Sequence, residues 1–285
     1  MLERADRVGG LAASFEVGGQ RVDHGSHRLH PSAAPEVLGA LSQLLGSDLQ
    51  RRTRNGRIHI AGRFVAFPPR PADLVRRFPP SFTAGLVRDA FTRPLRRPRA
   101  DTFAEVVRAS LGPTLADHFY APYVSKIWGL PPDELAGELA RKRVSARGPR
   151  DLAARVLRPA RRREFLYPRR GFGEISERLA DAAVAAGATI RLGVDATRIV
   201  AGPDGVVVDG GDGTGFGAAW AFSTLPVSVL ARIMSPSPPP DVVTAAAALR
   251  SRGLVLVYLQ LDQPHFTEFD AHYFPEPAIV ASRMG

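Results

Sequence analysis

The chain has 285 residues, of which 45% are hydrophobic and 23% are charged, a balance typical of a folded globular protein. It contains no cysteine, which excludes thiol nucleophiles, cysteine-ligated metal centres and disulfides. No apolar run approaches the roughly 18 residues needed to cross a bilayer, and charged residues interrupt the N-terminus where a signal peptide would be apolar. These features predict a cytoplasmic protein.

The formal net charge is +10, and every basic residue except Lys126 and Lys142 is arginine. The arginines cluster at residues 93–99, 161–163 and 169–170. No basic motif with interleaved aromatic residues accompanies the charge, so nucleic acid is not expected as a partner. The charge suits an acidic small-molecule substrate or a peripheral contact with an anionic membrane surface, and the oligomeric state stays open.

The first predicted elements are a strand that ends at Glu3 and a glycine-rich turn that follows it. A helix is predicted after Ser32, its expected N-cap, with a stop at Gly46. Residues 57–67 predict a hairpin, with Ile58 and Ile60 alternating before the turn at residues 61–62, and Phe64 and Ala66 after it.

Residues 67–163 are rich in proline and arginine and predict an inserted, mainly helical region. Its clearest helix covers residues 102–111, where Thr102 and Glu105 form a capping box. The α/β pattern resumes at Phe165, with a helix over residues 173–186 and strands over residues 188–192, 196–200, 206–208 and 218–224. Residues 253–261 are apolar on both faces and predict a buried strand.

The opening residues carry the most specific chemistry. An acidic residue at a strand end is the position that binds ribose hydroxyls in dinucleotide-binding proteins. Here Glu3 stands at such an end, and Gly9 and Gly10 would let the backbone approach a pyrophosphate or a flavin ring.

Two motifs strengthen this interpretation. Glu3-x-x-x-Arg7-Val8-Gly9-Gly10-Leu11, followed by Gly19-x-x-x-Asp23-x-Gly25-Ser26-His27, resembles the start of flavin-dependent amine-oxidase-type proteins. That superfamily includes protoporphyrinogen oxidase, phytoene desaturases and UDP-galactopyranose mutase. The segment Phe165-Leu166-Tyr167-Pro168-x-x-Gly171-Phe172-Gly173 is similar to the family's returning FAD segment.

The resemblance implies FAD as the cofactor and a set of residues that contact it. These residues are Glu3, Arg7, Gly9, Gly10, Leu11, Gly25, Ser26, His27 and Ala196, where the family usually has valine at the last position. It also implies a substrate helix with Tyr120, Tyr123, Lys126 and Trp128, although a helix that packs its aromatic residues into the core would show the same pattern.

The implied fold is α/β, a Rossmann-like FAD-binding domain with an inserted, largely helical and β-sheet substrate domain. The expected division is residues 1–66 and 164–225 for the FAD-binding domain, 67–163 for the helical insertion, and 226–285 for an incomplete substrate-domain sheet. The family's first strand with its G-x-G-x-x-G turn, and its C-terminal Gly-Asp flavin segment, have no counterpart here. We therefore expect a chain truncated at both ends.

Three functions remain open. The leading one is an FAD-dependent oxidoreductase that transfers a hydride from an acidic or cyclic organic substrate to the flavin. The second is a non-redox flavoenzyme similar to UDP-galactopyranose mutase, and the third is a cofactor-free, inactive chain.

The remaining polar residues are given other roles. A metal site at His24, His27 and His30 is not expected, because Gly25 interrupts any helix that would align them. Asp23 is expected to hydrogen-bond turn amides rather than to act in catalysis. No catalytic acid or base is identified.

Overall fold

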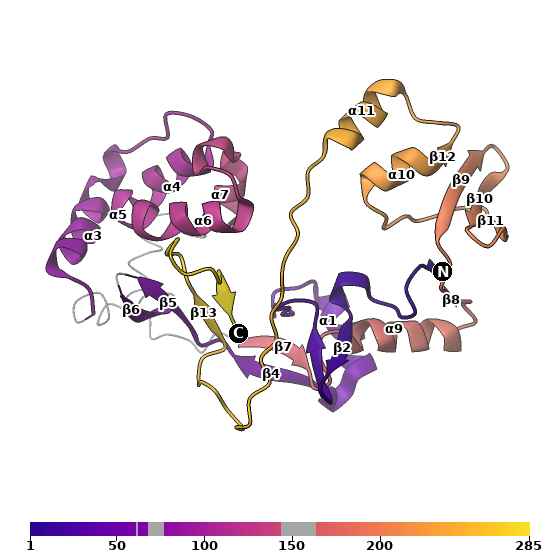
Figure 1. Ribbon diagram of the computed structural model, residues 1–285, viewed down its shortest axis with the longest axis horizontal. Helices are drawn as coiled ribbons and strands as arrows, with labels where there is room; N and C mark the ends of the chain where they lie inside the picture. Colours follow the sequence, from indigo (N-terminus) through magenta and orange to yellow (C-terminus); the bar gives the residue numbers. More distant parts are fainter. Residues whose placement is uncertain (61, 68–76, 144–163) are drawn as a thin grey trace. The chain divides into compact units, whose positions relative to one another are not determined.

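The computed structural model describes residues 1–60, 62–67, 77–143 and 164–285 (Figure 1). It is a mixed α/β protein with helices and several sheets. The chain forms two compact units: unit 1 contains Met1–Arg51 and Leu166–Gln260, and unit 2 contains Arg52–Phe165 and Leu261–Gly285. The four functional segments expected from the sequence stay a prediction, because compactness does not assign a cofactor or a substrate to either unit.

Unit 1 contains short strands in several small sheets. β1 pairs in parallel with β8, β2 and β3 form an antiparallel hairpin, and a four-stranded sheet has the order β11-β10-β9-β12. A further two-stranded sheet joins β4 and β7, of which residues 49–51 and 166–168 belong to this unit. These strands are β1 (Leu2–Glu3), β2 (Ser14–Val17), β3 (Gln20–Asp23), β4 (Leu49–Thr53), β7 (Glu164–Pro168), β8 (Arg191–Leu192), β9 (Ala196–Gly202), β10 (Gly205–Gly210), β11 (Gly215–Ala218) and β12 (Met234–Ser235).

The helices of unit 1 are η1 (Gly10–Ala12), α1 (Pro35–Leu45), η2 (Gly46–Asp48), α9 (Glu174–Ala185), α10 (Val227–Ile233) and α11 (Pro240–Ala248). Helix α1 ends at Gly46 as predicted, with φ 51° at that glycine. The prediction of Ser32 as its N-cap is wrong, because Pro35 opens the helix and the Ser32 hydroxyl is hydrogen-bonded to the His30 ring at 2.6 Å.

Unit 2 contains a four-stranded sheet of order β14-β13-β5-β6 (Figure 1). Its helices lie between β6 and β13 in the sequence. Its strands are β5 (Gly56–Ile60), β6 (Arg63–Phe67), β13 (Ala271–Tyr273) and β14 (Arg283–Met284). Its helices are α3 (Pro80–Thr92), η3 (Arg93–Leu95), α4 (Phe103–Leu111), α5 (Pro113–Leu115), the π-helix η4 (Ala116–Tyr120), α6 (Ala121–Trp128), η5 (Pro132–Glu134) and α7 (Gly137–Arg143).

The predicted hairpin is confirmed, since β5 and β6 are antiparallel with Ile58 opposite Val65. The buried position on β6 is Val65, which is 1% exposed, rather than the predicted Phe64 and Ala66. Residues that face each other across a hairpin point to the same side of the sheet, so Val65 joins Ile58 and Ile60 in the core.

One half of the capping box predicted for the helix at residues 102–111 is present, whereas the Glu105 carboxylate accepts from the Arg99 amide at 2.9 Å rather than from Thr102. The Thr102 hydroxyl accepts a hydrogen bond from the Glu105 amide at 3.3 Å, and Phe103, Val106 and Val107 form the buried face of α4. They belong to the helical core of unit 2, in which each turn of α4 contributes apolar surface.

The prediction of a buried strand at residues 253–261 is wrong. This stretch carries no strand, and Leu254, Val255 and Leu259 are 72%, 88% and 78% exposed. Within the described residues no strand pairs with it. The predicted strand at 218–224 is likewise reduced to the end of β11 at Ala218. An apolar run becomes a buried strand only when neighbouring strands or helices cover it.

None of the helices among the described residues has the length and apolar character needed to cross a membrane.

Candidate functional site

The glycine turn after β1 has two different surfaces. Gly9 has φ 104°, and a Cβ there would lie 3.1 Å from the side chain of Ser176 on α9. Gly10 has φ 53°, and no atom lies within 4 Å of the place where its Cβ would be. The first glycine therefore lets α9 pack against the turn, and the second leaves the backbone open to a ligand.

The Gly25–His27 segment lies beside this turn. The Nε2 atom of His27 is hydrogen-bonded to the Leu11 carbonyl oxygen at 2.9 Å. Its ring also lies 5.1 Å from the ring of Phe172 in the returning segment. The side chains of Leu11 and Ser26 are exposed. The structure thus brings together Leu11 and His27, two predicted site residues that are sixteen positions apart.

A buried carboxylate holds this region in place. Asp23 accepts hydrogen bonds from the Ser14 hydroxyl at 2.5 Å, from the Phe172 amide at 2.9 Å and from the Tyr167 hydroxyl. The Ser14 hydroxyl in turn accepts from the Gly173 amide at 2.8 Å. The predicted role of Asp23, a hydrogen bond to a turn amide, is confirmed.

Two glycines make this approach of backbone and side chain possible. A Cβ at Gly171 would lie 2.6 Å from the Ser14 hydroxyl, and one at Gly173 would overlap the Ser14 amide. The motif at residues 165–173 carries both glycines, but nothing in the sequence marked Ser14 as their partner. Tyr258, whose hydroxyl donates to the Asp23 carbonyl, was also missed, because an isolated tyrosine in an apolar run gives no signal of a distant contact.

Glu3 and the segment before Ala196 lie side by side. The Val194 amide donates to the Glu3 carbonyl oxygen at 3.0 Å, and the Ala5 amide donates to the Glu3 carboxylate at 2.8 Å. Ala196 opens β9 opposite Gly210. The guanidinium of Arg7 lies 2.9 Å from the carboxylate of its exposed neighbour Asp6.

These features fit a flavin dinucleotide. Glu3 ends a parallel strand, the position from which a carboxylate accepts hydrogen bonds from ribose hydroxyls. The open space at Gly10 would admit a phosphate or a ring against the backbone. The cofactor contacts of the nine residues named from the sequence stay a prediction.

The predicted substrate residues lie on η4 and α6 of unit 2. Tyr120 packs against both apolar clusters of the unit, and burial raises the pKa of its hydroxyl. Tyr123 stacks on Phe119 with ring centres 5.5 Å apart, and Trp128 packs against the helical core.

Lys126 makes a different set of contacts. Its ammonium group donates to the carbonyl oxygens of Phe274, Glu276 and Ala281 at 2.8, 2.9 and 3.0 Å. Burial lowers the pKa of Lys126 below its usual value, and the charge of the nearby Glu276 offsets only part of this shift. The substrate role of the four residues Tyr120, Tyr123, Lys126 and Trp128 stays a prediction.

The arginine clusters serve partly structural roles. Arg96 donates to the Asp89 carbonyl and lies 3.7 Å from its carboxylate, and Arg169 pairs with Asp48 at 3.0 Å. The cluster at residues 161–163 lies outside the described residues.

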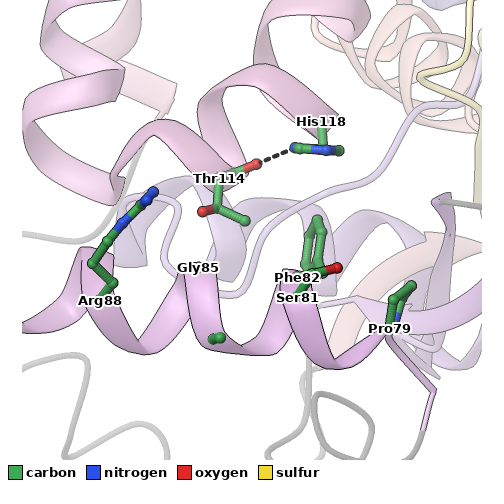
Figure 2. Close-up of a pocket in the computed structure, with 8 residues that line it drawn as sticks. Pro79, Ser81, Phe82, Gly85, Arg88, Thr114 and His118 are labelled. Carbon is green, nitrogen blue, oxygen red and sulfur yellow. Dashed lines mark hydrogen bonds between the residues drawn. The ribbon is translucent and has the colours of Figure 1, made fainter.

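A cavity of about 670 Å³ lies in unit 2 between α3 and the α5–η4 segment (Figure 2). His118 stands over Phe82 with ring centres 5.2 Å apart, and its Nδ1 atom is hydrogen-bonded to the Thr114 carbonyl at 2.9 Å (Figure 2). Arg88 lines the other end but contacts the carboxylate of Asp89 at 3.3 Å. No ligand chemistry was assigned to these residues from the sequence. Among the described residues no group of three acidic or histidine side chains could hold a metal ion.

The comparison with protein families gives one match, which covers residues 1–280: flavin-containing amine oxidoreductase. The chain belongs to this family. The match includes every residue of the glycine turn, the Gly25–His27 segment and the returning segment. No match was found among curated protein sequences.

Several solved structures resemble the chain in fold. A reduced UDP-galactopyranose mutase matches with a TM-score of 0.78 at 20% identity, over 99% of this chain and 63% of the mutase. Cyclohexylamine oxidase from Brevibacterium oxydans matches with a TM-score of 0.56 at 18% identity, over 86% of this chain and 56% of the oxidase. An Exiguobacterium protein described as a protoporphyrinogen oxidase gives 0.57 at 22% identity, over 85% and 56%. The chain thus spans less than two thirds of each of these proteins.

Proposed function

We propose that this family member contributes the cofactor-contacting and substrate-contacting parts of an FAD-dependent oxidoreductase for a small organic substrate. The observation that carries the proposal is the turn at Gly9 and Gly10, whose backbone is open at Gly10 and whose Leu11 carbonyl is fixed by His27. The family match over residues 1–280 supports flavin as the ligand of this turn.

The flavin, when bound, supplies the redox chemistry by accepting a hydride from a C–H bond of the substrate. The side chains of the chain then serve to bind and orient. Gly10 admits the cofactor to the backbone, the Glu3 carboxylate accepts hydrogen bonds from ribose hydroxyls, and the buried Asp23 network fixes the distance between the two motifs. None of these roles requires an acid or a base.

On the substrate side, Tyr123 and Trp128 form an apolar wall, and Tyr120 is buried behind it. Lys126 acts on the substrate only indirectly, by fixing the carbonyls of Phe274, Glu276 and Ala281. The net charge of +10 favours an acidic substrate.

A second function, a non-redox reaction similar to that of UDP-galactopyranose mutase, is favoured by one observation. The mutase fold matches 99% of the chain with a TM-score of 0.78, whereas the oxidase folds match 85–86% with scores of 0.56–0.57. The two functions differ in one property: the non-redox reaction proceeds only with flavin that has been reduced beforehand, and the oxidase reaction consumes oxidised flavin.

The first experiment is a visible absorption spectrum of the purified chain after incubation with FAD and desalting. A retained flavin spectrum that is perturbed by the protein supports the proposal, and a colourless protein supports the cofactor-free alternative. Gly10→Asn tests the site, because asparagine tolerates positive φ while its side chain fills the open space.

Gly19→Asn is the matched control, since Gly19 also has a positive φ of 75° and no atom within 4 Å of its Cβ position. Gly10→Asn should weaken flavin binding at least about tenfold, the loss expected when one steric or hydrogen-bonding contact of ~1.4 kcal/mol is removed. Equal flavin retention by the two variants would show that the cofactor lies elsewhere.

A further inference from the structure

The sheet of unit 2 has one face that the helical core does not cover. Along β5, Ile58 and Ile60 belong to the apolar core, so Arg57 and His59 point to the opposite side. His272 on β13 is paired with Arg57, and Phe64 on β6 is paired with His59. Cross-strand partners share a face. One face of the sheet therefore collects an arginine, two histidines and an aromatic ring.

Arg57 packs between two aromatic rings. Its guanidinium carbon lies 4.1 Å from the ring centre of Phe64 and 4.4 Å from that of Phe269. Its Nε atom is buried and has no hydrogen-bond partner, and no carboxylate among the described residues forms an ion pair with it. Burial lowers the pKa of Arg57, which is the direction expected when a charge loses water and gains no counter-ion.

His59 lies next to Arg57 on the same strand and is held in one orientation. Its Nδ1 atom is 2.8 Å from Oε1 of Glu276, and its side chain is 21% exposed. Because the Nδ1–H group donates to the Glu276 carboxylate, Nε2 is the ring nitrogen left for a ligand, and it donates to an anion only in the imidazolium form of the ring. The rings of Phe64 and Phe274 lie 4.9 and 6.2 Å from the imidazole.

The other titratable groups on this face do not neutralise Arg57. His272 is fully buried, and burial together with the charge of Arg57 lowers its pKa, so its ring is neutral at pH 7. The Asp270 carboxylate accepts the Asn55 amide at 2.7 Å. Glu276 is engaged by His59, and its main-chain carbonyl is held by Lys126.

We propose that this face binds the carboxylate of a small organic acid, with Arg57 as the anion contact, the imidazolium form of His59 as a second donor through Nε2, and the rings of Phe64 and Phe274 against its apolar body. Glu276 is a positioning residue that sets the orientation of His59. The site lies within unit 2 and does not depend on flavin binding, so it can be present or absent whatever the outcome for the proposed function.

A carboxylate fits this site better than a phosphate group. The face offers one permanent cation, whose planar fork of donors matches the two oxygens of a carboxylate. A dianion would meet the negative charge of Glu276 with only one fixed positive charge to balance it. The aromatic rings favour a ligand whose body is planar and apolar.

The test is isothermal titration calorimetry of the full chain with benzoate and with benzamide, its uncharged counterpart of similar shape. Benzoate should bind at least about tenfold more tightly than benzamide, because a charge-assisted hydrogen bond is roughly twice as strong as a neutral one. Arg57→Gln should remove this preference, and Arg141→Gln should keep it. Arg141 is a suitable control because it is an exposed arginine of the same unit whose partner is Asp101. Equal binding of the two probes, or equal benzoate binding by the two variants, overturns the proposal.

A second measurement keeps the test decisive where Arg57→Gln fails to fold. Arg57→Lys keeps the charge and much of the apolar stem but loses the planar fork, so benzoate binding should fall by an intermediate factor. In ¹⁵N spectra of the wild-type protein, benzoate should shift the Arg57 Nε and His59 ring signals and leave the Arg141 Nε signal in place. Glu276→Gln should change the His59 ring signals before any ligand is added. Unshifted Arg57 and His59 signals at saturating benzoate would show that the acid does not bind here.

Discussion

Lys126 and Lys142 are the only lysines of the chain, and their surroundings differ in every respect. The ammonium of Lys126 donates to three carbonyl oxygens that lie 148, 150 and 155 positions further along the chain. Lys142 is exposed and pairs with Glu138 one helical turn away. Lys126 therefore stabilises tertiary structure, whereas Lys142 makes only a local ion pair on the surface of a helix.

Lys126→Met should lower the free energy of unfolding by about 2–3 kcal/mol, because a charged donor and its hydrogen bonds to buried or half-buried carbonyls are lost together. Lys142→Met should change it by no more than about 0.5 kcal/mol, the contribution of an exposed pair at this spacing. Urea denaturation measures both values. Similar midpoints for the two variants would mean that the three carbonyls bind water equally well.

A second prediction at the scale of single residues concerns the buried carboxylate of Asp23. Asp23→Asn replaces an acceptor oxygen by an NH2 group that faces donors, so the variant should lose about 3 kcal/mol of stability. Asp212→Asn is the control, because the carboxylate of Asp212 accepts one amide hydrogen bond in an exposed turn. Its cost should stay below about 1 kcal/mol. Thermal unfolding of the two variants decides whether Asp23 holds the region together.

Single residues were predictable from the sequence where their partners are local or belong to a motif. The amide bonded by Asp23 comes from the glycine-rich segment that the sequence itself marked at residues 171–173. The partners of Lys126 were not predictable, because backbone carbonyls leave no trace in the side-chain pattern. The same holds for Arg57 and His59, whose shared face depends on the register of β5 with β13.

At the scale of elements, local signals succeeded and long-range ones did not. Gly46 ended a helix and Thr102 capped one, since both effects act within a single turn. The apolar run at residues 253–261 failed as a strand, because its burial depends on neighbours that the run does not specify. Apolar composition predicts that a segment will be buried, but it does not indicate which strand or helix would cover it.

This exposed run makes a prediction about surface behaviour. The double substitution Val255→Ser with Val257→Ser should lower the fluorescence of a dye that binds exposed apolar surface, because both side chains are more than three quarters exposed. The free energy of unfolding should change by less than about 0.5 kcal/mol. Val107→Ser should instead lower the free energy of unfolding by more than about 2 kcal/mol, since Val107 is 1% exposed. An unchanged dye signal in the double variant would show that the run is covered in solution.

At the scale of the whole molecule, His272 links global stability to pH. Burial, and then the charge of Arg57, lower the pKa of this histidine in the folded state below its ordinary value of 6.5. The unfolded chain therefore takes up a proton at a higher pH than the folded chain does. Stability is present above about pH 6.5 and is lost as the pH falls below it, by up to about 1.4 kcal/mol for each pH unit until the folded form is also protonated.

The expected result is a larger loss of unfolding free energy between pH 7.5 and pH 5.5 in the wild type than in His272→Asn. His265→Asn, which alters an exposed histidine, should keep the loss seen in the wild type. Urea titrations at the two pH values give the comparison. If His272→Asn and the wild type have equal pH dependence, other groups account for the acid sensitivity.

Each compact unit is assembled from two stretches of chain that are far apart in the sequence. β1 pairs with β8, which lies about 190 positions later in the sequence, and β5 pairs with β13, which lies more than 200 positions later. On the ribosome, the first unit is therefore complete only after residue 260 has been synthesised, and the second only after residues 261–285 have followed. Contacts of such long sequence separation form slowly, and exposed apolar segments wait meanwhile for their neighbours. The chain is thus expected to depend on chaperones during synthesis, and neither unit can be expressed as one uninterrupted stretch of the natural sequence.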